Sequence, residues 1–502
     1  MLQIQSIAAL GAVAGTALTL WLIFSLYRVF TSPLRAVPGP LLARYTNLWY
    51  LWRLSKSQFA YENIALHEKY GNIVRYGPNR FSFCDPRASK VIYGHGSHFV
   101  KSSWYTTFGN PEPHHWGLFP DQNSQRIAQN RRQYQSMYSM SSLVTYEPYV
   151  DECADLLGVR LEEMAHANLP VDMGHWFQCY AFDVIGMITY SKRLGFLDRG
   201  EDIGGLIKTL EGFLSYASMT GLFPFLHTPL SRINNWLAGS KGSGRSFIGT
   251  FTEETVREHE SAPKASRLSE EGQPGIAVDF LTKFMSKHRE NPGSFTRYHI
   301  LEGCVGNMIA GSDTTAISLS ALLYYILRNR RVFYKLREEV DVRCREGNMS
   351  KSVTYKETLE MPYFQAVMKE TLRLHPATGL PLERVVPKGG TTICDQFFPE
   401  GDVFGDDADE FRPERWLEGD LNKLSMMNHH WMPFGLGSRT CIGRHISWLE
   451  ISKLVPRLVR DYDFELAGHL EDPRRRWETS HFFFIKPQEF IVRVKPRCAV
   501  SQ

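Results

Sequence analysis

The sequence has no C-x-x-C pair and no cluster of closely spaced cysteines. Its 8 cysteines are scattered over 502 residues, which argues against both a disulfide scaffold and a structural zinc site. A net charge of +4 is nearly neutral for this length, so charge gives no reason to expect nucleic acid as a partner. No G-x-G-x-x-G segment is present. Electrons for a redox reaction would therefore have to come from a separate protein.

Charged residues are also missing from one long segment near the start. The run from Ile4 to Tyr27 has no charge and is longer than the roughly 20 residues that a membrane span needs. The basic residues that follow it are Arg28, Arg35 and Arg44. Their position places the rest of the chain on the cytoplasmic side. A cleaved signal peptide is the alternative, but the basic start that such peptides carry is missing and the apolar run is too long. We expect residues 1–30 to be a single-pass anchor in the endoplasmic reticulum membrane, with the catalytic domain facing the cytosol.

The remaining pattern predicts a mainly helical chain with a smaller β region. Prolines at 33, 38 and 40 predict a stiff connector over 31–45, followed by one catalytic domain over 46–502. A helix from about 296 to 329 is apolar nearly all round and therefore buried. A second helix begins at Met361-Pro362 and ends before Pro376. Short strands at 74–76 and 80–83, a long loop at 94–125, an exposed connection at 239–275 and a hairpin at 482–495 complete the prediction.

The most distinctive segment is FGLGSRTCIG, residues 434–443. Gly435 and Gly437 permit a tight loop that wraps closely around a flat ligand, and Gly443 lets the next helix approach that ligand. The run after Cys441 has a helical pattern. Cys441 then lies at a helix N-terminus, where the dipole and free N–H groups lower the pKa of a thiol. For an isolated cysteine, the alternative is a buried structural residue in a glycine-rich turn.

This segment matches F-x-x-G-x-R-x-C-x-G, the haem-binding loop of cytochromes P450, and the chain resembles that family. The resemblance implies the cytochrome P450 fold, a haem b cofactor and Cys441 as the axial thiolate ligand of the iron. It also implies that Phe434, Gly435 and Gly443 shape the haem-binding loop. By the same resemblance, the cations that hold the haem propionates would be Arg131, Arg384 and Arg439. The family usually has Trp or His four residues before Arg131, where this chain has Ile127.

A second motif supports the resemblance. Glu370 and Arg373 lie one helical turn apart and can pair, although alone they would be a common surface ion pair. Together with RPERW at 412–416, they match the E-x-x-R and PER motifs of the family. The resemblance implies a buried triad of Glu370, Arg373 and Arg415 that holds the haem loop. Loss of one member should abolish folding around haem, because a buried ion network is costly to break.

The third motif is AGSDTT at 310–315, within the long helix. Here the resemblance implies that Gly311 opens space for a diatomic ligand and that Asp313 and Thr314 form an acid–alcohol relay. Oxygen activation needs such positioned proton donors. The alternative is that Asp313 and Thr314 only form hydrogen bonds to the helix backbone.

Three weaker phrases resemble the fungal pisatin-demethylase-like group of the family: YEPYVD at 146–151, CYAFDVIG at 179–186 and VFGDDA at 403–408. They imply a monooxygenase in fungal secondary metabolism that hydroxylates, epoxidises or O-dealkylates a small lipophilic metabolite. The implied partners are NADPH–cytochrome P450 reductase and, as an additional donor, cytochrome b5.

By analogy with the family, the substrate pocket would be roofed by residues 94–125 and 205–230, the start of the long helix and the turn at 478–484. Apolar and aromatic residues in these segments suit a lipophilic substrate. These residues are Phe108, Trp116, Phe119, Phe213, Leu222, Phe225, Met308 and Phe482 to Phe484. Ordinary core packing is the alternative for each of them.

The chain departs from the family between Gly401 and Asp402, where a strand and a short helix are missing. A tolerated shortening, a splicing error in the gene and an inactive form all fit this gap, since a lost strand leaves unpaired backbone groups on its neighbours. A non-catalytic, membrane-anchored haem protein is therefore one alternative function. A haem-thiolate rearrangement enzyme is another, but such chemistry has no need of the Asp313–Thr314 relay.

Overall fold

The structure is a computed structural model that describes residues 34–112, 115–239, 242–261, 278–388, 391, 393 and 408–497, with short pieces at 15–16, 19–20, 23–24, 26–27 and 29–32. Two compact units make up the chain: residues 1–88 with 392–398, and residues 89–391 with 399–502.

The smaller unit contains the two strands predicted near its end. β1 (Ile73–Gly77) and β2 (Arg80–Phe83) pair antiparallel. Tyr50 packs on Phe59 and Tyr76 at ring distances of 4.4 and 5.0 Å and forms an aromatic core beside them. The other elements of this unit are η1 (Leu42–Arg44), α2 (Leu48–Ser55) and α3 (Phe59–Tyr70), and α4 (Pro86–Tyr93) continues into the larger unit.

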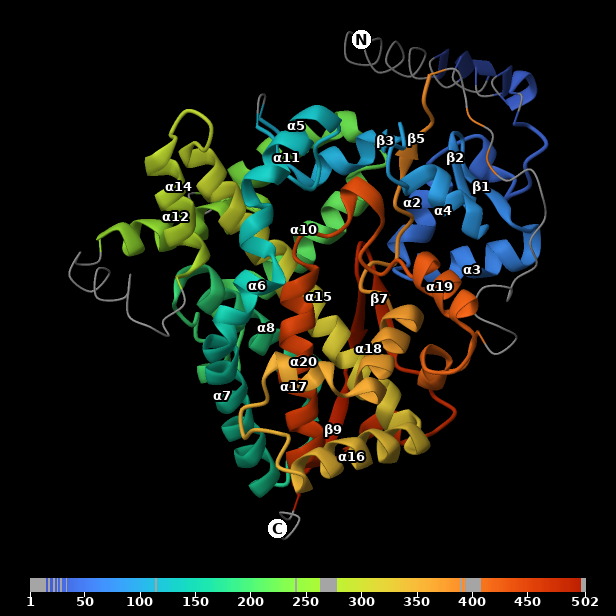
Figure 1. Cartoon of the computed structure of the whole chain (residues 1–502). Helices are drawn as coiled ribbons and strands as arrows, with labels where there is room; N and C mark the ends of the chain where they lie inside the picture. The colour runs from blue at the N-terminus through green and yellow to red at the C-terminus, as the bar shows by residue number, and fades with distance from the viewer. Residues whose placement is uncertain are drawn as a thin grey trace, which may run out of the picture. The chain divides into compact units, whose positions relative to one another are not determined.

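The larger unit is mainly helical, as predicted (Figure 1). Its longer helices are α5 (Ser124–Tyr134), α7 (Glu147–His166), α8 (Met173–Tyr190), α10 (Leu206–Thr220), α11 (His227–Ala238), α12 (Arg245–Ser261), α14 (Phe280–Glu290), α15 (Arg297–Arg328), α16 (Arg330–Arg345), α18 (Pro362–Leu374), α19 (Leu421–His430) and α20 (Arg444–Asp461). The short helices are η2 (Ser103–Phe108), η3 (Gln135–Tyr138), α6 (Met140–Leu143), η4 (Val144–Tyr146), α9 (Phe196–Arg199), η5 (Ile203–Gly205), η6 (Pro224–Leu226), α17 (Tyr355–Leu359), η8 (Pro413–Trp416), η9 (Gly437–Arg439) and η10 (Gly468–Glu471).

Strands are few and short in this unit. They are β3 (Val100–Lys101), β4 (Val171–Asp172), β5 (Arg384–Val385), β6 (Tyr462–Leu466), β7 (Glu478–His481), β8 (Ile485–Gln488) and β9 (Ile491–Pro496). In the described part of the chain they form the sheets β3-β5, β4-β9-β6 and β7-β8. The predicted hairpin at 482–495 is wrong, because β8 pairs with β7 while β9 pairs with β4 and β6.

α15 and α8 form the centre of the larger unit. α15 is the long buried helix that the sequence predicts, and it contacts α8, α12, α14, α18 and α20. α8 is buried along almost all of its length because its apolar residues leave no polar stripe. The second predicted helix is also confirmed, as α18.

Two predicted loops contain regular structure. The connection expected at 239–275 contains α12. Ile248 and Val256 give this helix a buried apolar face, but the glycines and serines around residue 240 made the sequence pattern resemble that of a loop. The loop expected at 94–125 contains β3 and η2.

Two predictions lie partly or wholly outside the described residues. They are the membrane anchor at 1–30 and the shortened segment at Gly401–Asp402. Within the residues that are described, no helix combines the length and the apolar composition of a membrane span. The predicted domain bounds at 1–30, 31–45 and 46–502 stay predictions.

Candidate active site

The loop around Cys441 is closed on itself by its own backbone. The Cys441 N–H donates to the Phe434 carbonyl at 2.8 Å, and the Gly435 N–H donates to the Met432 carbonyl at 2.9 Å. Gly435 and Gly437 take φ values of +70° and +63°, which side chains disfavour. At Gly437 a Cβ atom would also lie 2.1 Å from the Tyr93 carbonyl oxygen. Glycine is therefore required at position 437 by both conformation and space.

The thiol of Cys441 lies just before α20, which begins at Arg444. Burial raises the pKa of this thiol, and backbone N–H groups of Gly443 and Arg444 together with the Arg131 guanidinium act in the opposite direction. The residue is nevertheless solvent-accessible. Cys441 is therefore enclosed by protein around its thiol, while the residue as a whole remains within reach of solvent.

α15 also has accessible positions. Ala310 is exposed, and Gly306, Ile309, Gly311 and Thr314 are partly exposed, whereas the other residues from 302 to 324 are buried. A Cβ atom built on Gly306 or Gly443 would meet nothing within 4 Å. A Cβ atom at Gly311 would lie 2.8 Å from the Ile185 side chain, so this glycine lets α8 and α15 approach each other. Its role in opening space for a diatomic ligand stays a prediction.

α15 and α20 are tied together beside these accessible positions. Thr315 Oγ1 and Ser447 Oγ form a buried hydrogen bond of 2.9 Å. Because Thr315 follows Thr314, and Ser447 lies in the second turn of the helix after the Cys441 loop, this bond brings the two motifs into the same region.

None of the three predicted cations forms an ion pair with a carboxylate of the described residues. Arg131 donates to the Thr440 carbonyl at 2.6 Å, and Arg439 donates to the Asp121 carbonyl at 3.1 Å. Arg384 donates to the Glu383 carbonyl at 2.9 Å. The second terminal nitrogen of Arg439, Nη1, is buried and has no hydrogen-bond partner among the described residues.

Lys101 is a fourth cation that the sequence analysis missed. It stands directly opposite Arg384 in the β3-β5 pair, and its Nζ donates to the Phe119 carbonyl at 2.6 Å. Burial lowers the pKa of this amine well below its ordinary value, and the charges of Arg384 and Arg439 lower it further. Like charges directly opposite each other destabilise a strand pair, so this cluster is arranged to receive an anion.

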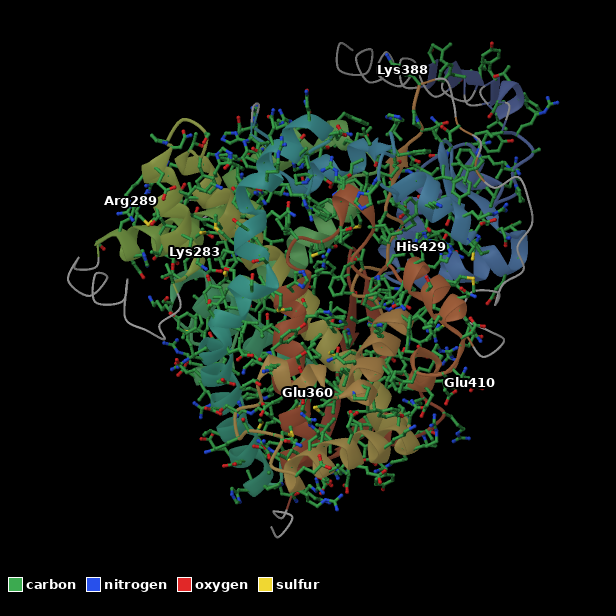
Figure 2. The ribbon with its side chains drawn as sticks, in the orientation of Figure 1. Lys283, Arg289, Glu360, Lys388, Glu410 and His429 are labelled. Atoms are coloured by element: carbon green, nitrogen blue, oxygen red, sulfur yellow. The ribbon has the colours of Figure 1, made fainter. Side chains whose placement is uncertain are left out.

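The carboxylate of Glu370 is fully buried and collects donors from α18 and from residues 412–416. It accepts hydrogen bonds from Arg373 at 2.9 and 3.0 Å and from Arg415 Nε at 2.8 Å. The Arg412 N–H and the Trp416 indole complete the set at 2.9 and 3.0 Å. Both arginines also donate to the carbonyl of Glu410, which is labelled in Figure 2.

Aromatic rings connect this carboxylate with the Cys441 loop. Trp416 contacts Trp431 at a ring distance of 6.4 Å, and the Trp431 indole donates to the Lys369 carbonyl of α18 at 3.0 Å. Trp431, Phe434 and Trp448 are in mutual contact at 6.0 to 6.1 Å. The sequence motifs mark both ends of this connection but not Trp431 or Trp448 between them.

In the described part of the chain, the side chains of Asp313 and Thr314 form no hydrogen bond with each other. The Asp313 carboxylate is buried and accepts a hydrogen bond from the Gln178 side chain, whereas Thr314 Oγ1 donates to the Ala310 carbonyl at 2.7 Å. Burial raises the pKa of Asp313. The threonine therefore makes the backbone bond that was the alternative to a relay, while the aspartate does not.

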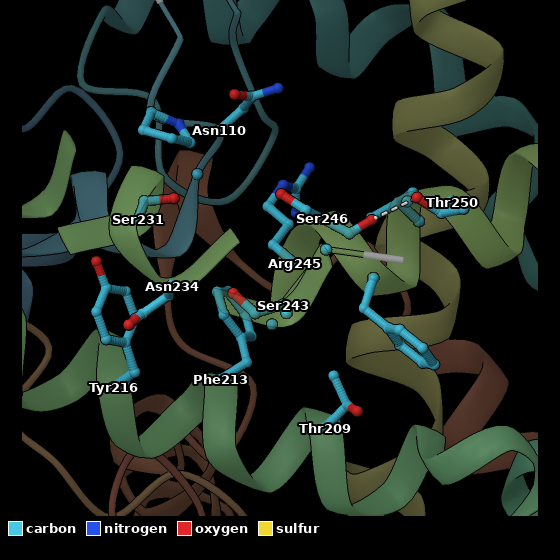
Figure 3. Close-up of a pocket in the computed structure, with 18 of the residues that line it drawn as sticks. Asn110, Thr209, Phe213, Tyr216, Ser231, Asn234, Ser243, Arg245, Ser246 and Thr250 are labelled. Atoms are coloured by element: carbon cyan, nitrogen blue, oxygen red, sulfur yellow. Dashed lines mark hydrogen bonds between the residues drawn. The ribbon is translucent and has the colours of Figure 1, made fainter. Parts of the chain in front are cut away.

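A cavity of about 990 Å³ lies between α10, α11, α12 and the first turns of α15 (Figure 3). Hydroxyl and amide side chains such as Thr209, Tyr216 and Asn234 line it, and a buried ion pair between Arg245 and Glu302 forms part of its wall. Of the expected aromatic residues only Phe213 lines it. Phe108, Phe119 and Phe483 instead pack on one another at ring distances of 5.1 to 5.5 Å.

Comparison with known proteins identifies the family. The model of the family described as "Cytochrome P450" matches residues 38–494. The chain belongs to the cytochrome P450 family. It is 36% identical to a pisatin demethylase of Fusarium vanettenii over 96% of this chain and 92% of the relative. It is 36% identical to a cytochrome P450 monooxygenase of Aspergillus terreus (92% and 96%) and 33% identical to gsfF of Penicillium aethiopicum (93% and 94%).

Cytochromes P450 are haem-thiolate monooxygenases, and the residues described above fit such a haem. The accessible positions at Gly306, Ala310 and Cys441 belong to segments that the Thr315–Ser447 hydrogen bond holds together. The partnerless Arg439 Nη1, beside Lys101 and Arg384, fits the negative charge of the propionates.

Replacing Gly437 by Ala should prevent haem incorporation, because the Cβ atom would collide with the Tyr93 carbonyl. Gly468→Ala is the matched control: Gly468 has the same φ of +63°, but a Cβ there meets nothing within 4 Å. We expect the control to bind haem normally and to lose only about 1 kcal/mol of unfolding free energy. Equal haem content in the two purified variants would contradict the close approach.

Glu370→Gln should reduce haem content at least about tenfold, since removing one partner of a buried ion network costs about 3–5 kcal/mol. Glu360→Gln is the control, because Glu360 (Figure 2) pairs with Arg343 while 59% exposed. Haem per chain, from the ratio of Soret to protein absorbance, measures the effect. A normal ratio in Glu370→Gln would show that the loop does not depend on this carboxylate.

Proposed function

We propose that Cys441 is the axial ligand of the haem iron and that the enzyme oxidises a small lipophilic metabolite. The observation that carries the proposal is Cys441, a solvent-accessible residue whose thiol lies beside the backbone N–H groups of Gly443 and Arg444. Phe434, Gly435 and Gly443 would shape the loop against the haem. Arg131, Arg384 and Arg439 would hold the propionates, with Lys101 beside them.

The bound haem would supply oxygen activation, which electron donation from a cysteine thiolate favours. The protein's own task is then to deliver protons and to exclude water. Thr314, on the accessible stretch of α15, would pass on a proton, and the neighbouring Asp313 would restore it. For this step the Thr314 hydroxyl must leave the Ala310 carbonyl, a rotation about one side-chain bond.

The substrate would enter through the cavity beside α10 and α12. Its lining of hydroxyl and amide groups, with Phe213 and Val305 between them, suits a metabolite that is largely apolar but carries polar groups. Similarity to a pisatin demethylase supports dealkylation as one reaction, beside hydroxylation and epoxidation, in fungal secondary metabolism.

The electrons would come from NADPH through a cytochrome P450 reductase, with cytochrome b5 as an additional donor. The uncharged run from Ile4 to Tyr27 supports a membrane anchor, which would keep the catalytic domain on the cytosolic face of the endoplasmic reticulum beside a membrane-bound reductase.

The ligand assignment predicts a thiolate-type Soret band in the reduced, CO-bound protein, and Cys441→Ser should remove it. Cys344→Ser serves as the control, since Cys344 lies beside Arg460 and Asp461 at the end of α20, whereas the Cys441 loop precedes the start of that helix. A thiolate band that persists in Cys441→Ser would end the assignment.

The relay predicts that Thr314→Ala consumes NADPH but recovers several-fold more of the consumed O₂ as hydrogen peroxide, because a positioned proton donor contributes about 10²–10⁴-fold to the step it serves. Thr314→Ser, which keeps the hydroxyl, should remain close to wild type. If Thr314→Ala released no more peroxide than Thr314→Ser, the threonine hydroxyl would serve only as a hydrogen-bond donor to the helix backbone.

A further inference from the structure

The buried carboxylate of Asp313 is held by an amide and not by a cation. The Gln178 Nε2 group, from α8, donates to Asp313 Oδ1. Gln178 is the one side chain in the described part of the chain that forms a hydrogen bond with this carboxylate. Glu370, the other buried carboxylate of the site, instead has two arginines directly on its oxygens. The two carboxylates are therefore built differently.

A charge lies one contact further out. Lys486 of β8 donates from Nζ to Gln178 Oε1 at 3.1 Å and forms an ion pair with Glu211 of α10. The amide of Gln178 is therefore polarised from its oxygen by a cation while its nitrogen donates to the aspartate. Glu211, Lys486, Gln178 and Asp313 thus form a row of successive contacts. They come from four separate elements: α10, β8, α8 and α15, in that order.

Exposure rises along the row from the inside to the outside. Asp313 and Gln178 are 2% and 3% exposed, whereas the side chains of Lys486 and Glu211 are 23% and 48% exposed. Lys486 is fixed in place by the β7-β8 pairing, in which it stands opposite Ser480, and β8 packs against α15. The row thus connects solvent with the buried carboxylate through contacts of defined geometry.

The surroundings of Asp313 are not those of a carboxylate whose role is to stabilise the fold through an ion pair. A buried carboxylate without a direct cation loses much of its hydration free energy, and one neutral hydrogen bond returns only part of it. The pKa of Asp313 is raised by burial, and the charge of Lys486 and the hydrogen bond from Gln178 act against that rise. The charge of Glu211 raises it again, and no charged group of α12, α14, α18 or α20 in the described residues contributes. Asp313 is therefore left able to change its protonation state, unlike a carboxylate locked by arginine.

We propose that Gln178 and Lys486 are positioning residues that orient the Asp313 carboxylate and set its proton affinity for the relay to Thr314. Glu211 adjusts the influence of Lys486 from the surface. The inference deepens the proposed function and rests on it, since it assumes that Asp313 faces the oxygen-binding side of a haem.

The signs of the expected effects follow from the charges. Removing the positive charge of Lys486 raises the pKa of Asp313, and removing the negative charge of Glu211 lowers it. A role limited to packing would give no such opposition between two partners of one ion pair. Lys486→Arg keeps the charge and should keep the wild-type behaviour.

The experiment measures the infrared C–O stretch of carbon monoxide on the reduced, haem-loaded, full-length protein as a function of pH. We expect one inflection that Asp313→Asn abolishes. Lys486→Met should move it to higher pH by about one unit, since an opposite charge a few ångströms away shifts a carboxyl pKa by about 1–3 units. Glu211→Gln should move it to lower pH. Lys495→Met, which breaks the exposed Lys495–Glu465 pair of the β9-β6 sheet, is the control and should leave it unchanged.

Each of the other possible results would overturn the inference, the proposed function or both. An inflection that depends on Asp313 but does not move in Lys486→Met overturns the positioning role and leaves the proposed function intact. An inflection that survives Asp313→Asn, or the absence of any inflection, shows that Asp313 does not face the bound gas and overturns the inference as well. A wild-type protein without the thiolate Soret band overturns the proposed function and the inference together.

Discussion

The buried carboxylate of Glu370 accepts donors from two parts of the chain that are far apart in sequence, α18 and residues 412–416. An ionised carboxylate removed from water loses its hydration, and the arginine and N–H donors of these two segments replace it, so the two segments must meet. Trp416 extends the meeting point to Trp431, and Trp431 extends it to Phe434 and Trp448 on either side of Cys441. The position of the cysteine loop thus depends on an ion network that touches neither the loop nor the reacting atoms.

The site combines groups that cannot satisfy one another within the protein. Lys101 faces Arg384 across a strand pair, and Arg439 Nη1 is buried without a partner among the described residues. α15 has accessible positions at Gly306, Ala310 and Thr314, although most of the helix is buried. In the proposed function, the propionates of the haem would supply the negative charge that these cations lack.

Much of this could be predicted from the sequence, because short motifs of fixed spacing determine it. The periodicity of α15, the proline that begins α18 and the glycines around Cys441 all act locally. The features that the sequence did not predict are contacts between residues that lie far apart in the chain. The pairing of β8 with β7, the charge of Lys101 opposite Arg384 and the approach of Lys486 to Gln178 join residues that no local pattern relates. The close approach of Ile185 to Gly311 is a contact of the same kind, since Ile185 belongs to another helix.

The proposed function requires that the Cys441 sulfur binds the haem iron as a thiolate. Electron paramagnetic resonance of the resting, haem-loaded protein at low temperature tests this directly, because the spread of the low-spin g values depends on the axial ligand. We expect the narrow spread of g values that is typical of cysteinate ligation. A wide spread typical of two nitrogen ligands would contradict it.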